Sequence, residues 1–186
     1  MSDLVRRAGR GTDTTGAVVV WSVAEGRSGR RWREVRSVAG GGIVSSLLLE
    51  TDPAGRFSHA ELGTEAGLLT LHPEGDGTIH GNVVTAGGVE HIVGLPWGPD
   101  AVLFVEGSTI ASAAVAHGLR HAIAAGTSEA RPALFVDVSL AVRTGDMSIE
   151  RIGEDTWRLG SAGDVAVDDD GLPLLAGARI WPLEAE

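Results

Sequence analysis

Hydrophobic and polar residues alternate in short runs along most of the chain, and turn residues separate these runs. Alternation with a period of two predicts β-strands that bury one face. The strongest such run is 134–144, where leucine or valine occupies every second position from Leu134 to Val142. Segments 52–55 and 73–77 combine Pro, Asp and Gly, which favours tight turns between strands. The pattern therefore predicts a mainly β, antiparallel protein.

One segment, 108–125, departs from this pattern because it is rich in Ala, lacks Pro and repeats apolar residues at helical spacing. Ser108 is suited to cap the start of a helix, and Gly126 is suited to end it. We expect His117 and His121 on the polar side of this helix, together with Arg120. The predicted apolar stripe consists of Ala111, Val115, Leu119, Ala122 and Ile123.

These elements predict one curved β-roll or half-barrel, a meander of about 10–12 antiparallel strands packed on the single helix. Residues 16–186 are expected to form this domain, and residues 1–15 are expected to be a flexible leader. No apolar run reaches the length of about 18 residues that a membrane-spanning helix needs. We therefore expect no integral membrane segment and a cytoplasmic location.

The composition narrows the chemistry further. The chain of 186 residues has no Cys, which excludes disulfides and thiolate sites within it. Its fifteen positive charges are all Arg, a bias typical of a GC-rich bacterial genome. The acidic net charge of −10 disfavours nucleic acid as a partner.

The histidines are the first candidates for metal chemistry. His117 and His121 are four residues apart, so a helix would bring their imidazoles to one face. His59, His80 and His91 lie on three predicted strands, where they could converge on one metal ion. The simpler interpretation is that these five are separate surface histidines that bind no metal. We assign no metal and no cofactor.

Two further features are candidates for binding. Five arginines lie within 27–36, around Trp32, and we interpret them as a strand face that pairs with acidic residues, with an anion site as the alternative. Trp97 lies between Pro96 and Gly98 in a stiff loop. Its ring would either line the mouth of a pocket or plug one end of the barrel.

The order of features over Ser45–Leu119 resembles a bacterial family described as glycolipid-binding, which has a spiral β-roll fold. The resemblance covers a strand, a turn with Asp, a strand with Arg, an L-x-L run, a glycine turn and an Asp-containing strand before the helix. The matching segments are 47–50, 52–55, 56–61, 69–71, 77–81, 100–105 and 108–119. Ile79 stands where the family has Trp. The resemblance implies a β-roll that binds an amphipathic ligand.

Our leading hypothesis is a non-enzymatic protein that binds an apolar or amphipathic, glycolipid-like small molecule in a groove between helix and sheet. Trp97, His91, Val115 and Leu119 are the predicted ligand-binding residues, and no catalytic residue is assigned. One alternative is a metal-dependent enzyme that uses the histidines above. Another is a structural or interaction module, for example a homodimer.

Overall fold

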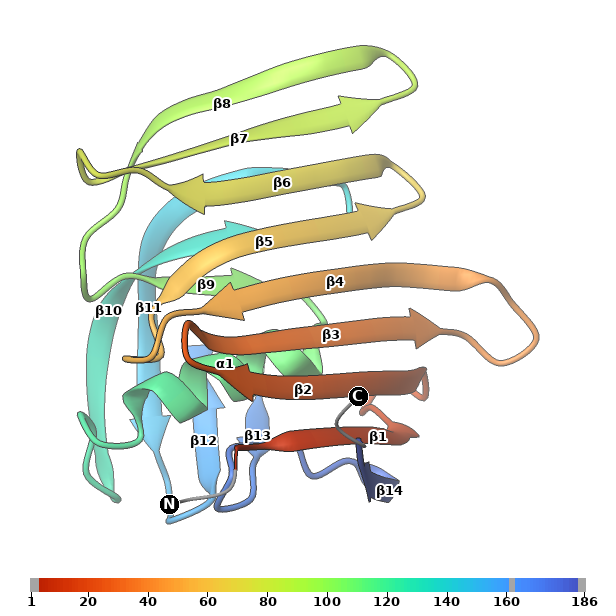
Figure 1. The fold of residues 1–186 in the computed structure, drawn as a ribbon, viewed down its shortest axis with the longest axis vertical. Coiled ribbons are helices and arrows are strands. Elements are labelled where there is room, and N and C mark those ends of the chain that lie inside the picture. Colours follow the sequence, from red (N-terminus) through yellow and green to blue (C-terminus); the bar gives the residue numbers. More distant parts are fainter. Residues whose placement is uncertain (1–3, 161–162, 184–186) are drawn as a thin grey trace.

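The computed structural model describes residues 4–160 and 163–183. Over these residues the chain forms fourteen strands in two sheets and one α-helix, α1 (Thr109–Leu119). In Figure 1 the larger sheet lies in front, and the smaller, curled sheet lies behind it with α1 between them. The prediction of a mainly β fold with a single helix is confirmed.

The larger sheet has nine strands, and every neighbouring pair is antiparallel. Strands β1 to β8 follow each other in chain order, and β14 pairs with the outer edge of β1. In spatial order the strands are β14 (Ala176–Pro182), β1 (Arg6–Thr12), β2 (Val18–Gly26), β3 (Gly29–Ser37), β4 (Ile43–Thr51), β5 (Phe57–Thr64), β6 (Gly67–Pro73), β7 (Thr78–Thr85) and β8 (Gly88–Pro96).

The smaller sheet has five strands and contains the one departure from an antiparallel meander. Its spatial order is β13 (Asp164–Ala166), β12 (Thr156–Leu159), β11 (Val142–Arg151), β10 (Thr127–Val136) and β9 (Val102–Val105). β9 and β10 are parallel, because α1 between them returns the chain to its starting end. This one parallel pair departs from the predicted antiparallel arrangement, and the fourteen described strands compare with the expected 10–12.

The expected leader is wrong for residues 6–12, which form β1 between β2 and β14. Residues 6–12 do not show the alternation of apolar and polar residues that predicts a strand, because glycine and not an apolar residue occupies the inward position 9. A β-carbon at Gly9 would overlap the ring of Trp21, which is directly opposite on β2. Trp21 therefore fills the space that an apolar residue of β1 would otherwise fill. Residues 1–3 of the expected leader lie outside the described part of the chain.

The run 134–144 is two strand ends and a turn rather than one strand. β10 ends at Val136 and β11 begins at Val142. Between them the Asp137 carboxylate accepts hydrogen bonds from the backbone N–H groups of Ser139 and Ala141. Leu140 has a positive φ of 68°, although its side chain is buried. Leu134, Val136 and Leu140 are buried, whereas Val138 lies in the turn and is 49% exposed. Two strand ends and a turn therefore produce the same sequence pattern as one long strand.

The helix begins as expected and ends earlier. Ser108 accepts a hydrogen bond from the N–H of Ala111 at 3.1 Å, so it is the N-cap. The predicted segment 108–125 is too long, because α1 ends at Leu119. The guanidinium of Arg151 donates to the carbonyl oxygens of Arg120 and Ile123, which satisfies groups that a longer helix would have bonded internally. None of the helices in residues 4–160 and 163–183 is long and apolar enough to cross a membrane.

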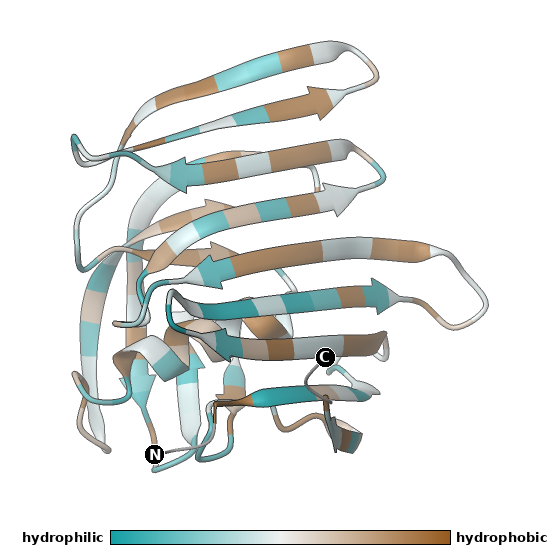
Figure 2. Cartoon of the chain, viewed as in Figure 1, coloured by the Kyte–Doolittle hydropathy of each residue, from teal (hydrophilic) through white to brown (hydrophobic). Residues whose placement is uncertain are grey.

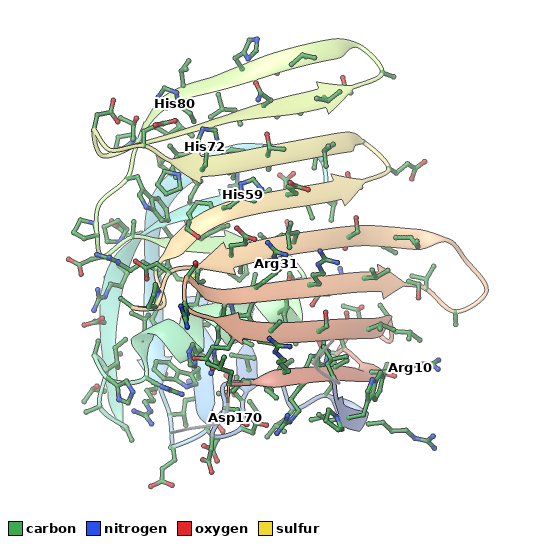
Figure 3. All side chains as sticks on the ribbon, in the orientation of Figure 1. Arg10, Arg31, His59, His72, His80 and Asp170 are labelled. Carbon is green, nitrogen blue, oxygen red and sulfur yellow. The ribbon has the colours of Figure 1, made fainter. Side chains whose placement is uncertain are left out.

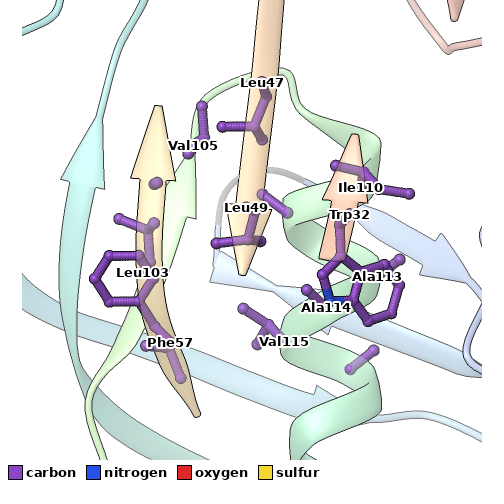
Figure 4. Close-up of a cluster of buried hydrophobic side chains, with 14 of the residues drawn as sticks. Trp32, Leu47, Leu49, Phe57, Leu103, Val105, Ile110, Ala113, Ala114 and Val115 are labelled. Atoms are coloured by element: carbon purple, nitrogen blue, oxygen red, sulfur yellow. The ribbon is translucent and has the colours of Figure 1, made fainter. Parts of the chain in front are cut away.

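The core is one continuous cluster that surrounds α1. All residues from Ile110 to Val115 are buried, because α1 packs on β3 on one side and on β9 and β13 on the other. Figure 4 shows Trp32 beside Ala113 and Ala114, with Leu49 and Leu103 near Val115. Figure 2 shows hydrophobic and hydrophilic positions alternating along many strands. Within α1, Ala111 and Val115 of the predicted stripe are buried and Leu119 is partly buried. The prediction is wrong for Ala122, which lies beyond the helix and is exposed, and the opposite side of the helix is buried as well.

We predict that Gly9→Ala destabilises the protein. The new methyl group would overlap the indole of Trp21, whose exposed fraction is only 2%, so either β1 or the ring must shift. Overpacking of this kind costs about 1–3 kcal/mol of unfolding free energy. Urea denaturation of the variant measures the loss.

Gly42→Ala is the matched control, because its β-carbon would meet no atom within 4 Å. An unchanged stability of Gly9→Ala would show that Trp21 is not packed against β1 as described here.

Candidate functional site

A row of polar side chains on β3 lies beneath α1. Arg30, Trp32, Glu34 and Arg36 alternate with exposed residues and are all buried. Sequence reasoning placed these arginines in a surface cluster that pairs with acidic residues. Arg30 pairs with Glu25 at 3.1 Å and Arg36 pairs with Asp13 at 2.7 Å, as the interpretation required, but both arginines point inward.

Glu34 holds the N-terminal end of α1. Its carboxylate accepts a hydrogen bond from the N–H of Ile110 at 2.9 Å. Burial raises the pKa of Glu34, and the Ile110 N–H and the neighbouring Arg36 oppose this shift in part. A carboxylate beside the first turn of a helix interacts favourably with the helix dipole. Glu34 therefore fixes where α1 starts over the larger sheet.

At the other end of α1, His117 meets Arg30. The Nη1 of Arg30 lies 3.5 Å from Nδ1 of His117, and the His117 ring lies 5.8 Å from that of Trp32. Arg30 has only donors, so Nδ1 accepts and the neutral ring carries its proton on Nε2. Burial, then Arg30, Arg120 and His121, lowers the pKa of His117 to about 3. His117 is therefore an uncharged donor at neutral pH, turned toward the sheet rather than to the expected polar surface.

One cavity lies on the side of α1 that faces the β4–β5 turn, and we call it the apolar pocket. It has a volume of about 70 Å³. Val115 and Leu119 line it from the helix, and Leu49, Phe57 and Leu103 line it from the two sheets. Charged groups stand at its rim: Arg131 pairs with Asp100 at 2.9 Å, and Arg56 pairs with Asp52 at 2.7 Å.

Glycine forms the closest contact between α1 and the β4–β5 turn. A β-carbon on Gly118 would lie 2.7 Å from the carbonyl oxygen of Gly55, and one on Gly55 would lie 2.6 Å from the Cα of Gly118. The two backbones therefore touch at one wall of the apolar pocket.

The four predicted ligand-binding residues do not form one group. Val115 and Leu119 line the apolar pocket. Trp97 is half-buried and packs edge-on against Phe57 at 5.4 Å between ring centres, so it supports the pocket wall from behind. His91 lies elsewhere, exposed on β8, where its Nδ1 is 2.7 Å from the side-chain oxygen of Asn82.

A second cavity, which we call the polar pocket, lies around the C-terminal end of α1 and has a volume of about 260 Å³. His117 and Arg120 line it from the helix end. Arg151 and Trp157 line it from β11 and β12, and four acidic residues complete it, namely Glu154, Asp155, Asp168 and Asp169. Apart from the two helix residues, sequence reasoning did not single out these positions. The sequence contains no indication that residues 168–171 pack against His117.

The remaining histidines lie apart from both pockets. Figure 3 shows His59, His72 and His80 on neighbouring strands of the larger sheet, and His72 is directly opposite His80. His59 and His72 each lie 3.0 Å from a glutamate two residues further along, Glu61 and Glu74. Within residues 4–160 and 163–183, no three His, Asp or Glu side chains are arranged to hold a metal ion. The structure therefore does not bring His59, His80 and His91 together, or His117 and His121 with a third ligand.

Comparisons of the chain with protein-family models, with curated proteins and with solved structures found no match. The resemblance to a glycolipid-binding family stays a prediction. The two pockets beside α1 are the features of the molecule that bear on its function.

We predict that Glu34→Gln gains stability relative to the unchanged protein as the pH rises above about 4.5. Because the pKa of Glu34 is raised in the folded state, the unfolded chain loses its proton first, and stability falls with rising pH through this range. Gln cannot ionise, so the variant lacks this fall. Urea denaturation from pH 4 to pH 8 gives the difference between the two proteins.

Glu65→Gln, at an exposed position in the β5–β6 turn, is the control, and its difference from the unchanged protein should show no such rise. A Glu34→Gln difference that falls with pH would contradict a buried carboxylate with a raised pKa.

We predict that His117 makes the fold sensitive to acid. Its pKa is lowered to about 3, whereas an unfolded chain has a histidine pKa near 6.5, so stability is present above pH 6.5 and is lost as the pH falls toward 3. His117→Phe keeps a ring beside Trp32 and removes the titrating group. Its melting temperature should decline less between pH 6.5 and pH 4 than that of the unchanged protein. Parallel acid-induced declines in the two proteins would refute this role.

Proposed function

We propose that this protein binds a small apolar or amphipathic molecule whose apolar end enters the apolar pocket. The observation that carries the proposal is the cavity between α1 and the β4–β5 turn, which Val115, Leu119 and Phe57 line. Apolar cavities in proteins are favourable sites for apolar groups, because the atoms that line the cavity lack dispersion contacts on the side that faces it. The charged rim of Arg56, Asp100 and Arg131 is suited to a polar end that stays near solvent.

The size of the cavity limits the ligand. A volume of about 70 Å³ accommodates the end of an alkyl chain, not a whole lipid. A longer chain needs the β4–β5 turn to move away from α1. At Gly55 and Gly118 the turn and the helix meet through backbone atoms, so no side chain of these two residues has to be withdrawn. We therefore expect affinity to rise with chain length and then to level off.

The test is calorimetric binding of straight-chain carboxylates from butanoate to dodecanoate, with native mass spectrometry to count bound molecules. Leu119→Trp should fill the pocket and weaken binding about tenfold or more, which corresponds to about 1.4 kcal/mol. Leu68→Trp is the matched control, because Leu68 is exposed on β6, away from the pocket. Both variants are first checked for an unchanged circular dichroism spectrum.

Two outcomes would overturn the proposal. One is the absence of binding by the unchanged protein to every member of the series. The other is equal binding by Leu119→Trp and Leu68→Trp, which would place the ligand elsewhere on the surface.

A further inference from the structure

The polar pocket is a second, chemically different site at the end of the same helix. It has a volume of about 260 Å³, compared with about 70 Å³ for the apolar pocket. The helix contributes different residues to each: Val115 and Leu119 to the apolar pocket, and Ala116, His117 and Arg120 to the polar one. A ligand of the polar pocket is therefore recognised independently of the function proposed above.

The pocket offers two donors from the helix end. Nε2 of His117 carries a proton, because Nδ1 accepts from Arg30, and among the described residues no acceptor lies within hydrogen-bond distance of Nε2. The Nε of Arg120 donates a hydrogen bond to Nε2 of His121, and its Nη1 donates one to the carbonyl oxygen of Asp169. Its Nη2 has no partner in residues 4–160 and 163–183. One neutral and one charged donor are thus left for a ligand.

The acceptors come from the opposite wall. The Oδ1 of Asp168 accepts hydrogen bonds from the backbone N–H groups of Asp170 and Leu172. Its Oδ2 has no partner in the described part of the chain. Burial raises the pKa of Asp168, and Asp170 and Asp169 add to the rise, while backbone hydrogen bonds oppose it. A raised pKa means that ionising Asp168 costs free energy, and a positive ligand group beside its carboxylate would offset that cost. Glu154 and Asp155 stand further out on the same wall and are exposed.

Arg151 lines the polar pocket, but its guanidinium is already hydrogen-bonded within the protein. Its guanidinium donates to the carbonyl oxygens of Arg120, Ile123 and Glu154, and it lies 5.3 Å from the ring centre of Trp157. These contacts satisfy carbonyl groups in the segment that follows α1, so this guanidinium is not free for a ligand. The open groups of the pocket are side chains of both charges.

We propose that the polar pocket binds a small zwitterion of amino-acid type, with the ligand carboxylate on Arg120 and His117 and the ligand ammonium on Asp168. Full charges of both signs in one cavity favour a ligand that carries the complementary pair. A simple anion would face Asp168, Glu154 and Asp155. A simple cation would face Arg120 and the N–H of His117. The volume is in the range of an amino acid with its side chain.

The experiment is isothermal titration of the full chain with each of the twenty standard amino acids. Any amino acid that binds is then compared with two analogues, the amine that lacks its carboxylate and the acid that lacks its ammonium. We expect both analogues to bind about tenfold more weakly or worse, because each loses one charge-assisted pair worth about 1.4 kcal/mol or more.

Two variants locate the site. Asp168→Asn keeps the oxygen that supports the turn and removes the charge, so it should weaken binding about tenfold or more while the melting temperature stays close to that of the unchanged protein. Asp146→Asn, an exposed position on β11, should bind as the unchanged protein does. If Asp168→Asn is poorly folded, Arg120→Gln tests the carboxylate side instead.

The proposal is overturned if no amino acid binds, or if an amine or acid analogue binds as tightly as its parent. It is also overturned if Asp168→Asn, or Arg120→Gln in its place, binds like Asp146→Asn. Leu119→Trp separates this result from the function proposed above. Loss of alkyl carboxylate binding without loss of amino-acid binding indicates two separate sites.

Discussion

The structure depends on how β3 matches its charges to the two ends of α1. Glu34 lies at the start of the helix, where N–H groups are unpaired, and Arg30 lies beside His117 in the last turn. Because a helix carries partial positive charge at its N-terminus and partial negative charge at its C-terminus, both charges stabilise this one orientation. The reverse orientation would place each charge beside a like partial charge. The polar row therefore selects the direction and position of a helix whose own apolar surface has little directional preference.

The same contacts fix the rotation of α1 between the two sheets. The residues from Ile110 to Val115 are small or aliphatic and buried on every side, so packing alone would permit several rotations about the helix axis. Contacts with Glu34 and Arg30 remove this freedom. With the rotation fixed, Val115 and Leu119 face the β4–β5 turn, and His117 and Arg120 face the turn at Asp168. The two pockets are consequences of one helix placement.

Sequence reasoning predicted what depends on local pattern. It found the β class, the N-cap at Ser108 and two residues of the apolar pocket, Val115 and Leu119, because alternation and helical spacing encode burial. It failed where glycine replaces an apolar residue, as at Gly9, and where two strand ends imitate one strand, as around Leu140. It could not assemble the polar pocket, because its two walls come from residues 116–120 and from residues 151–171, which meet only after the sheets pack.

The early end of α1 decides what the pockets can hold. In a helix that continued to residue 125, the carbonyl of Arg120 would accept from the N–H of Ala124, and Arg151 would lose that partner. Instead Arg151 crosses from β11 and takes the carbonyls of Arg120 and Ile123, so the chain turns away after Leu119. The turn leaves Arg120 beside Asp169 rather than within a further helical turn. One arginine of the smaller sheet thereby binds the carbonyl groups that follow the helix, and His117 and Arg120 remain at the wall of the polar pocket.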